Sequence, residues 1–304
     1  MAISRSQLVK ELEPGLNALF GLEYARYDQE WKGIFDSESS DRAFEEEVEL
    51  SGFGNAPVKA EGAGIQYDDA TEAHTSRYAH ETIALAFAIT EEAVEDNLYD
   101  RLSSRYTKAL ARSMANAKEI KGANVLNRAF NSSYTGGDGL ELCSTAHLTV
   151  SGGNYKNELS TAADLNETSL EQALIDIAGL IDNRGLKIAV KASKMIIPVN
   201  LQFVAERLMK TEQRVGTADN DINAIRSSGM VSGGYEVNHY LTDTDAWFIK
   251  TDAPNGLKHF NRTPIKTAME GDFDTGNVRY KARERYSFGF LIQEVCMLLL
   301  EYST

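Results

Sequence analysis

Two stretches in the first hundred residues alternate between large hydrophobic residues and polar or small ones. In FEEEVEL (44–50), apolar residues occupy one face of a strand and glutamates occupy the other. In TIALAFAI (82–89), large apolar residues alternate with Thr and Ala. Residues 52–74, between them, are rich in Gly, Ala and polar residues and hold little from which to build a core. We predict that residues 44–89 form a long β-hairpin arm, because a compact domain seldom carries so long a loop without a function for it.

A long helix is predicted to follow the arm. No Gly or Pro occurs from 91 to 121, and helix-favouring residues continue through Phe130. Thr90 is a suitable N-cap, and the acidic residues after it complement the helix dipole. We predict one helix over 91–130, about 60 Å long. Its main apolar positions recur every four residues and therefore wind around the helix, so that it contacts different neighbours along its length. These positions are Val94, Leu98, Leu102, Tyr106, Leu110 and Met114.

From residue 134 onward, helical and strand patterns are mixed. Amphipathic helices are predicted at 169–185, closed by Gly185 as a C-cap, and at 201–211. Strands are predicted at 194–200, 235–241, 246–251 and, as a longer closing β segment, 278–302. A chain of 304 residues can bury a large core as one big domain or two smaller ones.

Charge is distributed unevenly along the chain. Residues 1–100 hold 7 Lys and Arg against 22 Asp and Glu, a net charge of −15, whereas the whole chain carries −14. Three of these acids, Glu45, Glu47 and Glu49, form the acidic face of the arm strand. The closing β segment has an apolar face interrupted by Glu284 and an opposite face with four cations spaced about 7 Å apart. This basic row consists of Arg279, Lys281, Arg283 and Arg285.

The acidic face and the basic row are complementary in charge. We predict that the acidic arm base of one copy of the chain lies near the basic row of a neighbouring copy and steers their assembly. The alternative is that each row pairs within its own chain or faces water. A second basic stripe follows helical spacing on the predicted long helix. It consists of Arg101, Arg105, Lys108 and Arg112.

Candidate catalytic residues cluster in GDGLELCSTAHL, where a Cys, a Ser, a Thr and a His lie within five positions. In an extended chain, Cys143 and His147 lie about 13 Å apart, which is too far for a nucleophile and its base. A helix would bring them together, but the neighbouring Gly and Thr residues disfavour one. We therefore predict a structural strand or turn here and no catalytic residue.

Metal and cofactor sites are not indicated by the sequence. The two cysteines, Cys143 and Cys296, give neither a disulfide framework nor a paired ligand spacing, and the five histidines are scattered. Of these, His74 and His80 are interpreted as part of a polar arm surface. Asp243 and Asp245 are interpreted as a polar turn, and the Gly-rich pieces lack phosphate-binding patterns. No signal peptide or membrane-spanning run is apparent, so we expect a soluble, cytoplasmic protein.

The order of these parts resembles the major capsid protein of tailed bacteriophages, which has the Hong Kong 97-like fold. Four stretches are similar to the Mu-like major head subunit group and its relatives, and the likeness covers nearly the whole chain. They are SDRAFEEEVELSGFG, ETIALAFAITEEAVEDNLYDRLSSRYTKALARSMANAKE, GDGLELCSTAH and RYKARERYSFGF.

The resemblance implies an α+β fold with four parts. It implies an N-terminal arm (1–43), an extended β-hairpin loop (44–89), a peripheral domain (90–141 and 271–304) that contains the spine helix 91–130, and an axial domain (142–270). It further implies a structural protein without enzymatic activity or cofactor. Some relatives crosslink a loop Lys to an Asn of a neighbour, but beside Lys59 nothing marks a matching Asn, so that chemistry is not carried over.

The resemblance also implies the partners of the chain. Copies of it would form the hexamers and pentamers of an icosahedral shell in the virion, assembled in the bacterial cytoplasm with a scaffolding protein and a portal protein. The shell would enclose double-stranded DNA without reading its sequence. A decoration protein is left open. On this reading, the basic stripe of the long helix faces the DNA, with salt bridges to acidic neighbours as the alternative.

Two other functions stay open from the sequence. A tail or other tube-forming phage protein would also self-assemble, although a long spine and a long arm fit a shell better. A Cys–His hydrolase would need Cys143 as its nucleophile.

Overall fold

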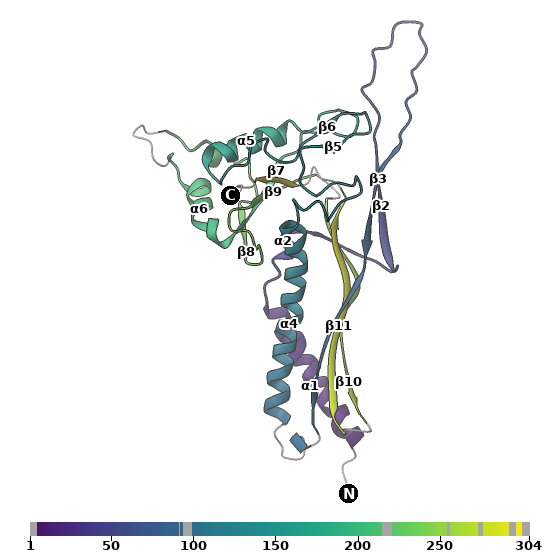
Figure 1. Cartoon of the computed structure of the whole chain (residues 1–304), viewed down its shortest axis with the longest axis vertical. Helices are drawn as coiled ribbons and strands as arrows, with labels where there is room; N and C mark the ends of the chain where they lie inside the picture. The colour runs from purple at the N-terminus through teal and green to yellow at the C-terminus, as the bar shows by residue number, and fades with distance from the viewer. Residues whose placement is uncertain are drawn as a thin grey trace.

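The chain folds into a stalk, a head at one end of the stalk, and an arm that extends beyond the head (Figure 1). The structure, a computed structural model, describes residues 5–90, 92–93, 99–214, 221–253, 256–272, 276–291 and 296–299. The first described helix starts at the foot of the stalk, and the last described strand lies in the head. The α+β class predicted from the sequence is confirmed.

The stalk consists of one long helix, a second helix beside it and a four-stranded sheet. Helix α4 (Tyr99–Asn127) lies inside the predicted range 91–130; Val94 and Leu98 lie outside the described residues. Residues Leu110 and Met114 are buried against α1 and the sheet, but Tyr106 is half exposed. The packed elements are α1 (Arg5–Arg26) and the strands, in sheet order, β1 (Asp36–Ser39), β10 (Leu257–Gly271), β11 (Val278–Phe290) and β4 (Glu81–Ile89).

The head is built around a second four-stranded sheet, whose core includes Met195, Ile197, Trp247 and Ile249. Its strands, in sheet order, are β12 (Cys296–Leu299), β9 (Trp247–Thr251), β7 (Ala192–Pro198) and β8 (Tyr235–Asn238). The helical elements are α5 (Glu167–Ala178), η1 (Val199–Leu201), α6 (Gln202–Lys210) and α7 (Ala224–Ser228). A two-stranded sheet of β5 (His147–Leu148) and β6 (Asn154–Tyr155) lies beside them, and α2 (Trp31–Ile34) lies where stalk and head meet (Figure 1).

The predicted pairing of the arm strands is wrong. Strand β2 (Phe44–Leu50) pairs with β3 (Glu72–Ala79), whereas β4 pairs along its whole length with β11 in the stalk. The reason is that Ile83 and Phe87 of β4 pack against the core between α4 and the stalk sheet. The hairpin arm therefore comprises 44–79, and its loop comprises 51–71.

Other boundaries also differ from the prediction. Helix α5 ends at Ala178 with Gly179 as its C-cap, whereas Gly185 lies in a later turn with a φ of 80°. The closing β segment is divided, because β11 belongs to the stalk and β12 pairs with β9 in the head. Strand β10 has no counterpart in the prediction, and it brings residues 257–271 into the stalk.

A buried ion pair joins the helix and the sheet of the stalk. The Nζ of Lys118 on α4 lies 3.3 Å from Oε2 of Glu284 on β11, and both side chains are nearly inaccessible. The ammonium lies between two rings, 4.9 Å from the centroid of Trp31 and 4.7 Å from that of Tyr286. Burial raises the pKa of Glu284 and lowers that of Lys118, while their mutual attraction opposes both shifts. The predicted apolar face of β11 is thus confirmed. Glu284, the one charged residue on that face, is paired with Lys118 of α4.

The N-terminal helices are attached to the same place. The hydroxyl of Tyr24 on α1 donates to Glu284 at 3.4 Å, and the backbone N–H of Trp31 donates to Glu119 at 3.1 Å. Burial raises the pKa of Glu119 to about 7. The His259 ring of β10 lies 4.3 Å from that of Trp31, and burial lowers the pKa of this histidine to about 3. The elements α1, α2, α4 and β11 therefore meet around one ion pair.

The substitution Lys118→Met should destabilise the chain by about 3–5 kcal/mol, because it leaves the Glu284 carboxylate buried without its partner. The double variant Lys118→Met/Glu284→Leu should recover most of that loss. Lys121→Met is the matched control, since Lys121 pairs with Glu81 at the surface and exposed pairs contribute only about 0–1 kcal/mol. Denaturant unfolding of the unassembled chain measures all three. If Lys118→Met and Lys121→Met lowered the free energy of unfolding equally, the stabilising role given to the buried Lys118–Glu284 pair would be contradicted.

Candidate assembly surfaces

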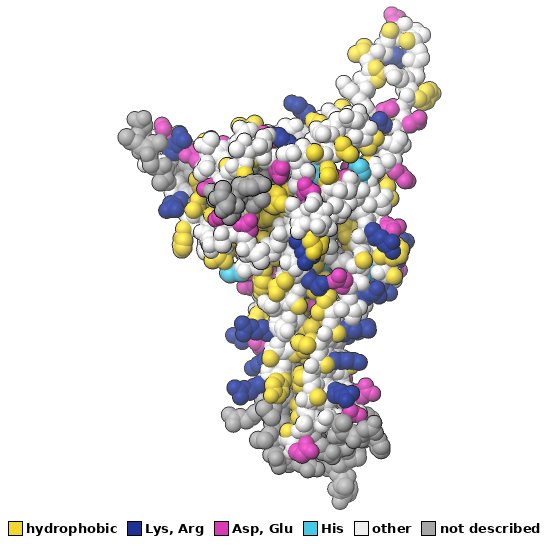
Figure 2. Space-filling view, in the orientation of Figure 1, with side chains coloured by type: hydrophobic (Ala, Val, Ile, Leu, Met, Phe, Trp, Pro, Cys, Tyr) yellow, Lys and Arg dark blue, Asp and Glu magenta, His cyan; other side chains and the backbone are white. Residues whose placement is uncertain are grey.

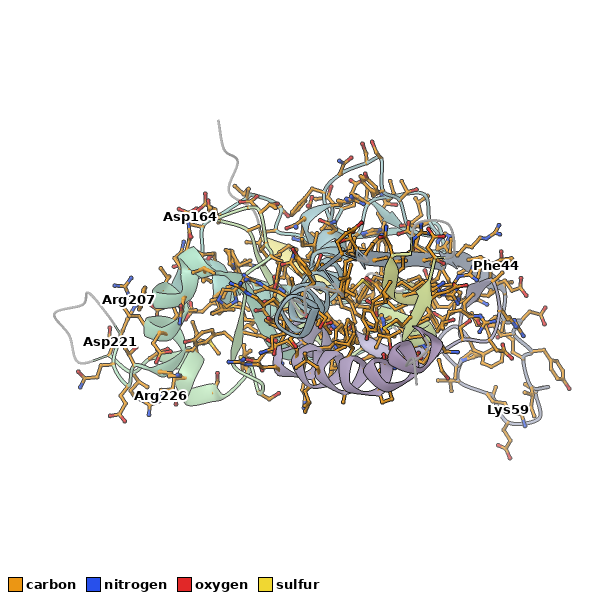
Figure 3. All side chains as sticks on the ribbon, turned by 90° about the horizontal axis from the view of Figure 1, so that it is seen from below. Phe44, Lys59, Asp164, Arg207, Asp221 and Arg226 are labelled. Atoms are coloured by element: carbon orange, nitrogen blue, oxygen red, sulfur yellow. The ribbon has the colours of Figure 1, made fainter. Side chains whose placement is uncertain are left out.

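The arm loop 51–71 leaves its apolar side chains in solvent. Val58 is 99% exposed and Tyr67 is 92% exposed, and Phe53 and Ile65 are also mostly exposed. Within the loop, the backbone hydrogen bonds are confined to its root and its tip. Figure 3 shows the Lys59 side chain pointing away from the rest of the molecule, at the opposite end from Arg207 and Arg226 of the head. The loop therefore buries almost nothing within one chain.

The root of the arm is held by a turn of the head. Arg184 donates from Nε to the carbonyl of Gly52 at 2.9 Å and from a second nitrogen to the carbonyl of Asp69. Its guanidinium also lies 3.8 Å from the Asp68 carboxylate. The preceding residue, Asn183, donates to Glu49. These contacts hold the two ends of the loop side by side and fix its direction relative to the head.

The acidic face of β2 points toward its own chain. Glu47 pairs with the buried Lys258 of β10, and Glu45 accepts a hydrogen bond of 2.6 Å from Ser40. Burial raises the pKa of Glu49, which accepts from Asn183. The apolar face of β2 is the outer one, with Phe44, Val48 and Leu50 exposed. The alternation predicted from the sequence is present, but its acidic side is half buried and its apolar side is not.

The basic row of β11 lies on the outer face of the stalk sheet. Lys281 and Arg283 are exposed and form no ion pair with any described residue, whereas Arg279 pairs with Asp272. Arg285 is half buried and donates to the carbonyl oxygens of His80 and Ala43, each at 3.4 Å. Arg285 thus contacts the backbone just before the acidic face, but among the described residues no cation of this row forms an ion pair with Glu45, Glu47 or Glu49 within one chain.

The basic stripe of the long helix lies on α4. Arg105, Lys108 and Arg112 are exposed and have no ion pair among the described residues, and the side chain of Arg101 lies outside them. Figure 2 shows dark-blue side chains along both flanks of the stalk, over α4 on one flank and over β10 and β11 on the other. The two basic surfaces therefore point in different directions.

The GDGLELCSTAHL segment contains a buried carboxylate–histidine pair. Nδ1 of His147 lies 2.6 Å from Oδ2 of Asp138, and both side chains are fully buried. The hydrogen bond from His147 lowers the pKa of Asp138 against the opposing effect of burial. Cys143 is also buried, and its backbone N–H donates to the carbonyl of Ala129. The pair has two members of a hydrolytic triad but no open surface for a substrate, and its position fits a structural role.

No local pattern in the sequence marks Asp138, because its partner lies nine positions away across an irregular loop. His80 also differs from the prediction of a polar surface, since it is buried and hydrogen-bonded at 2.9 Å to both Ser287 and Ser40. His74 makes a separate contact with the carbonyl of Leu148. Asp243 accepts from the backbone N–H of Asp245 at 3.0 Å, which confirms the predicted turn.

Two kinds of feature are absent from the described parts of the chain, a cluster of metal ligands and a helix that could span a membrane. No group of His, Cys, Asp and Glu side chains there could hold a metal ion. Likewise, none of the described helices combines the length and the apolar character that crossing a bilayer demands.

Comparison with known proteins identifies the family. Residues 72–296 match the family model described as phage capsid protein, and no curated protein matches the sequence. Among solved structures, the procapsid of bacteriophage JBD30 aligns with a TM-score of 0.53 at 14% identity, covering 99% of this chain and 77% of that one. A virus-like particle from Pyrococcus furiosus aligns with a TM-score of 0.51 at 10% identity, covering 93% and 97%. The capsid of Myoviridae phage XM1 aligns with a TM-score of 0.50 at 12% identity, covering 87% and 88%.

The family match spans most of the chain, and these structures share its fold. The chain belongs to the phage capsid protein family and is a structural, major capsid protein with the Hong Kong 97-like fold of tailed phages.

Proposed function

We propose that the chain assembles as hexamers and pentamers into an icosahedral head shell that encloses double-stranded DNA. The observation that carries this proposal is the arm loop, which is held at its root but exposes its apolar side chains in a single chain. Ordering such a loop costs conformational entropy that only contacts with other copies can offset. Membership of the capsid family supports the same conclusion.

The stalk would serve as the peripheral domain and the head as the axial domain around the centre of each capsomer. We further propose a scaffolding protein and a portal protein as assembly partners, and assembly in the bacterial cytoplasm before the shell becomes part of the virion. The role is structural, and the burial of Cys143 and of the Asp138–His147 pair disfavours a hydrolase. A tail or tube protein is the alternative, which electron microscopy of the purified protein would reveal as tubes instead of closed shells.

Deleting residues 55–66 tests the role of the arm. This deletion keeps the contacts of Arg184 with Gly52 and Asp69, so the shortened chain should fold with an unchanged melting temperature. It should form no closed shells, because the exposed apolar loop that contacts neighbours is missing. Calorimetry and electron microscopy measure the two properties separately. Normal shells from the deletion variant would contradict the proposed role.

The α4 stripe is proposed to contact packaged DNA through its phosphates, without sequence preference. Changing Arg101, Arg105, Lys108 and Arg112 to Gln should weaken binding of duplex DNA by the purified chain. The slope of log K against log salt should become shallower by about 0.9 for each phosphate that the variant no longer neutralises. Lys187→Gln/Lys191→Gln removes two exposed charges of the head and should change the slope little. An unchanged slope, or failure of the variant to assemble, would favour salt bridges to acidic neighbours instead.

The β11 basic row is proposed to contact the acidic arm base of a neighbouring copy. Reversing Glu45, Glu47 and Glu49 to Lys should block assembly, and reversing Arg279, Lys281 and Arg283 to Glu should partly restore it. Each exposed pair contributes only about 0.2–1 kcal/mol, so the effect depends on repetition over many contacts. Because Glu47 also pairs with Lys258, the matched control is Lys258→Glu in the reversed arm. Rescue by that change, and not by the row, would show that the glutamates act within their own chain.

A further inference from the structure

Strand β4 has a free edge. It is the last strand of the stalk sheet, and beyond it no described strand is hydrogen-bonded. Its pairing with β11 runs from Glu81 to Ile89 without a register shift, and after Glu81 and Thr82 every residue is apolar. The strand lacks the Lys, Pro or bulge with which edge strands commonly prevent pairing. Such an edge is a template for a strand from another chain.

On the outer face of the sheet, the side chains next to this edge are short. After Thr82, which lies opposite Arg285, the exposed residues of β4 on that face are three alanines, and each lies opposite a cation of β11 in the strand register. The pairs are Ala84 with Arg283, Ala86 with Lys281 and Ala88 with Arg279. Methyl groups leave these cations uncovered. A strand added beside β4 would lie about 10 Å from β11, a distance that long charged side chains span. Acidic side chains on the added strand would supply the counter-charges that Lys281 and Arg283 lack.

On the helix-facing side, the same edge is apolar. Leu85 is 47% exposed, and Tyr106 of α4 is 48% exposed beside Phe87, with ring centroids 5.7 Å apart. Figure 2 shows a hydrophobic stripe along the stalk between its two basic flanks. An added strand would place every second side chain against this stripe. Apolar side chains would fit there.

We propose that the free edge of β4 binds an extended peptide segment of another chain in which acidic residues alternate with apolar ones. The acidic residues would face Lys281 and Arg283, the apolar ones Leu85 and Tyr106, and the backbone would pair with Thr82–Ala88. This deepens, and rests on, the proposed contact between the basic row and an acidic segment. Double-stranded DNA would neutralise the cations, but it would leave the β4 backbone unpaired and Leu85 uncovered.

Residues 44–50 of this chain have the required alternation, so a synthetic peptide FEEEVEL is the probe. Fluorescence anisotropy with the full chain should detect its binding, and hydrogen exchange should show slowed amides within 82–88. Lys281→Glu/Arg283→Glu should weaken binding at least tenfold, whereas the matched reversal Lys187→Glu/Lys191→Glu in the head should not. A peptide of the same composition without the alternation, and an N-methylated FEEEVEL, should both bind at least tenfold more weakly.

Three results would overturn the proposal. The first is that the non-alternating peptide binds as tightly as FEEEVEL. The second is that the peptide slows exchange of amides elsewhere but not within 82–88. The third is that duplex DNA binds and displaces the peptide without slowing exchange in β4. Hydrogen exchange on the unaltered chain keeps the test decisive even if the charge-reversed variant does not fold. Shell formation enters none of these readouts, so failure of the peptide to bind is distinguishable from failure of the chain to assemble.

Discussion

The Lys118–Glu284 pair fixes how the helix and the sheet of the stalk are packed. Removing two charges from water costs more free energy than their attraction returns, unless the two groups lie close together and form further hydrogen bonds. Here the ammonium is enclosed by the Trp31 and Tyr286 rings, and Oε2 of the carboxylate also accepts from Tyr24, while its Oε1 is buried without a hydrogen-bond partner among the described residues. No rotation or translation of α4 along the sheet keeps all of these contacts. The stalk is therefore specified as one arrangement of four elements, where apolar packing alone would tolerate several.

Because the stalk has one fixed arrangement, the contacts at the arm root also fix the direction of the arm. The arm root is bound to the stalk through Glu47 and Lys258, and to the head through Arg184 and Asn183. Beyond these contacts the loop has no support from its own chain. The direction of the arm is thus determined within the subunit. The conformation of the loop depends on the contacts that it forms outside the subunit. In the proposed shell, this division would let the same arm reach neighbours in capsomers of different curvature.

The sequence predicted local features better than long-range ones. The faces of β11, the long helix and the Asp243 turn follow from periodicity and turn chemistry, and all are present. The predicted strand pairing is wrong. The alternation shows that 82–89 is a strand, but it does not show that its partner is β11, almost two hundred residues later. For a related reason, the alternation in β2 does not indicate which of its two faces turns toward the rest of the chain. A buried lysine on β10 turns the glutamates inward, and no local pattern marks that lysine.

Like charges in a row along a strand, and an apolar edge beside them, both reduce the stability of an isolated chain. Neither is required by the fold, since β11 buries its aromatic face regardless of what its outer face carries. Local rules are usually broken where a protein has a function to perform. In this chain the exceptions gather on the arm and on the edge of the stalk, and in the proposed contacts a second chain would supply the acidic and apolar groups that both lack. The isolated subunit is thus incomplete at the surfaces through which it would join a shell.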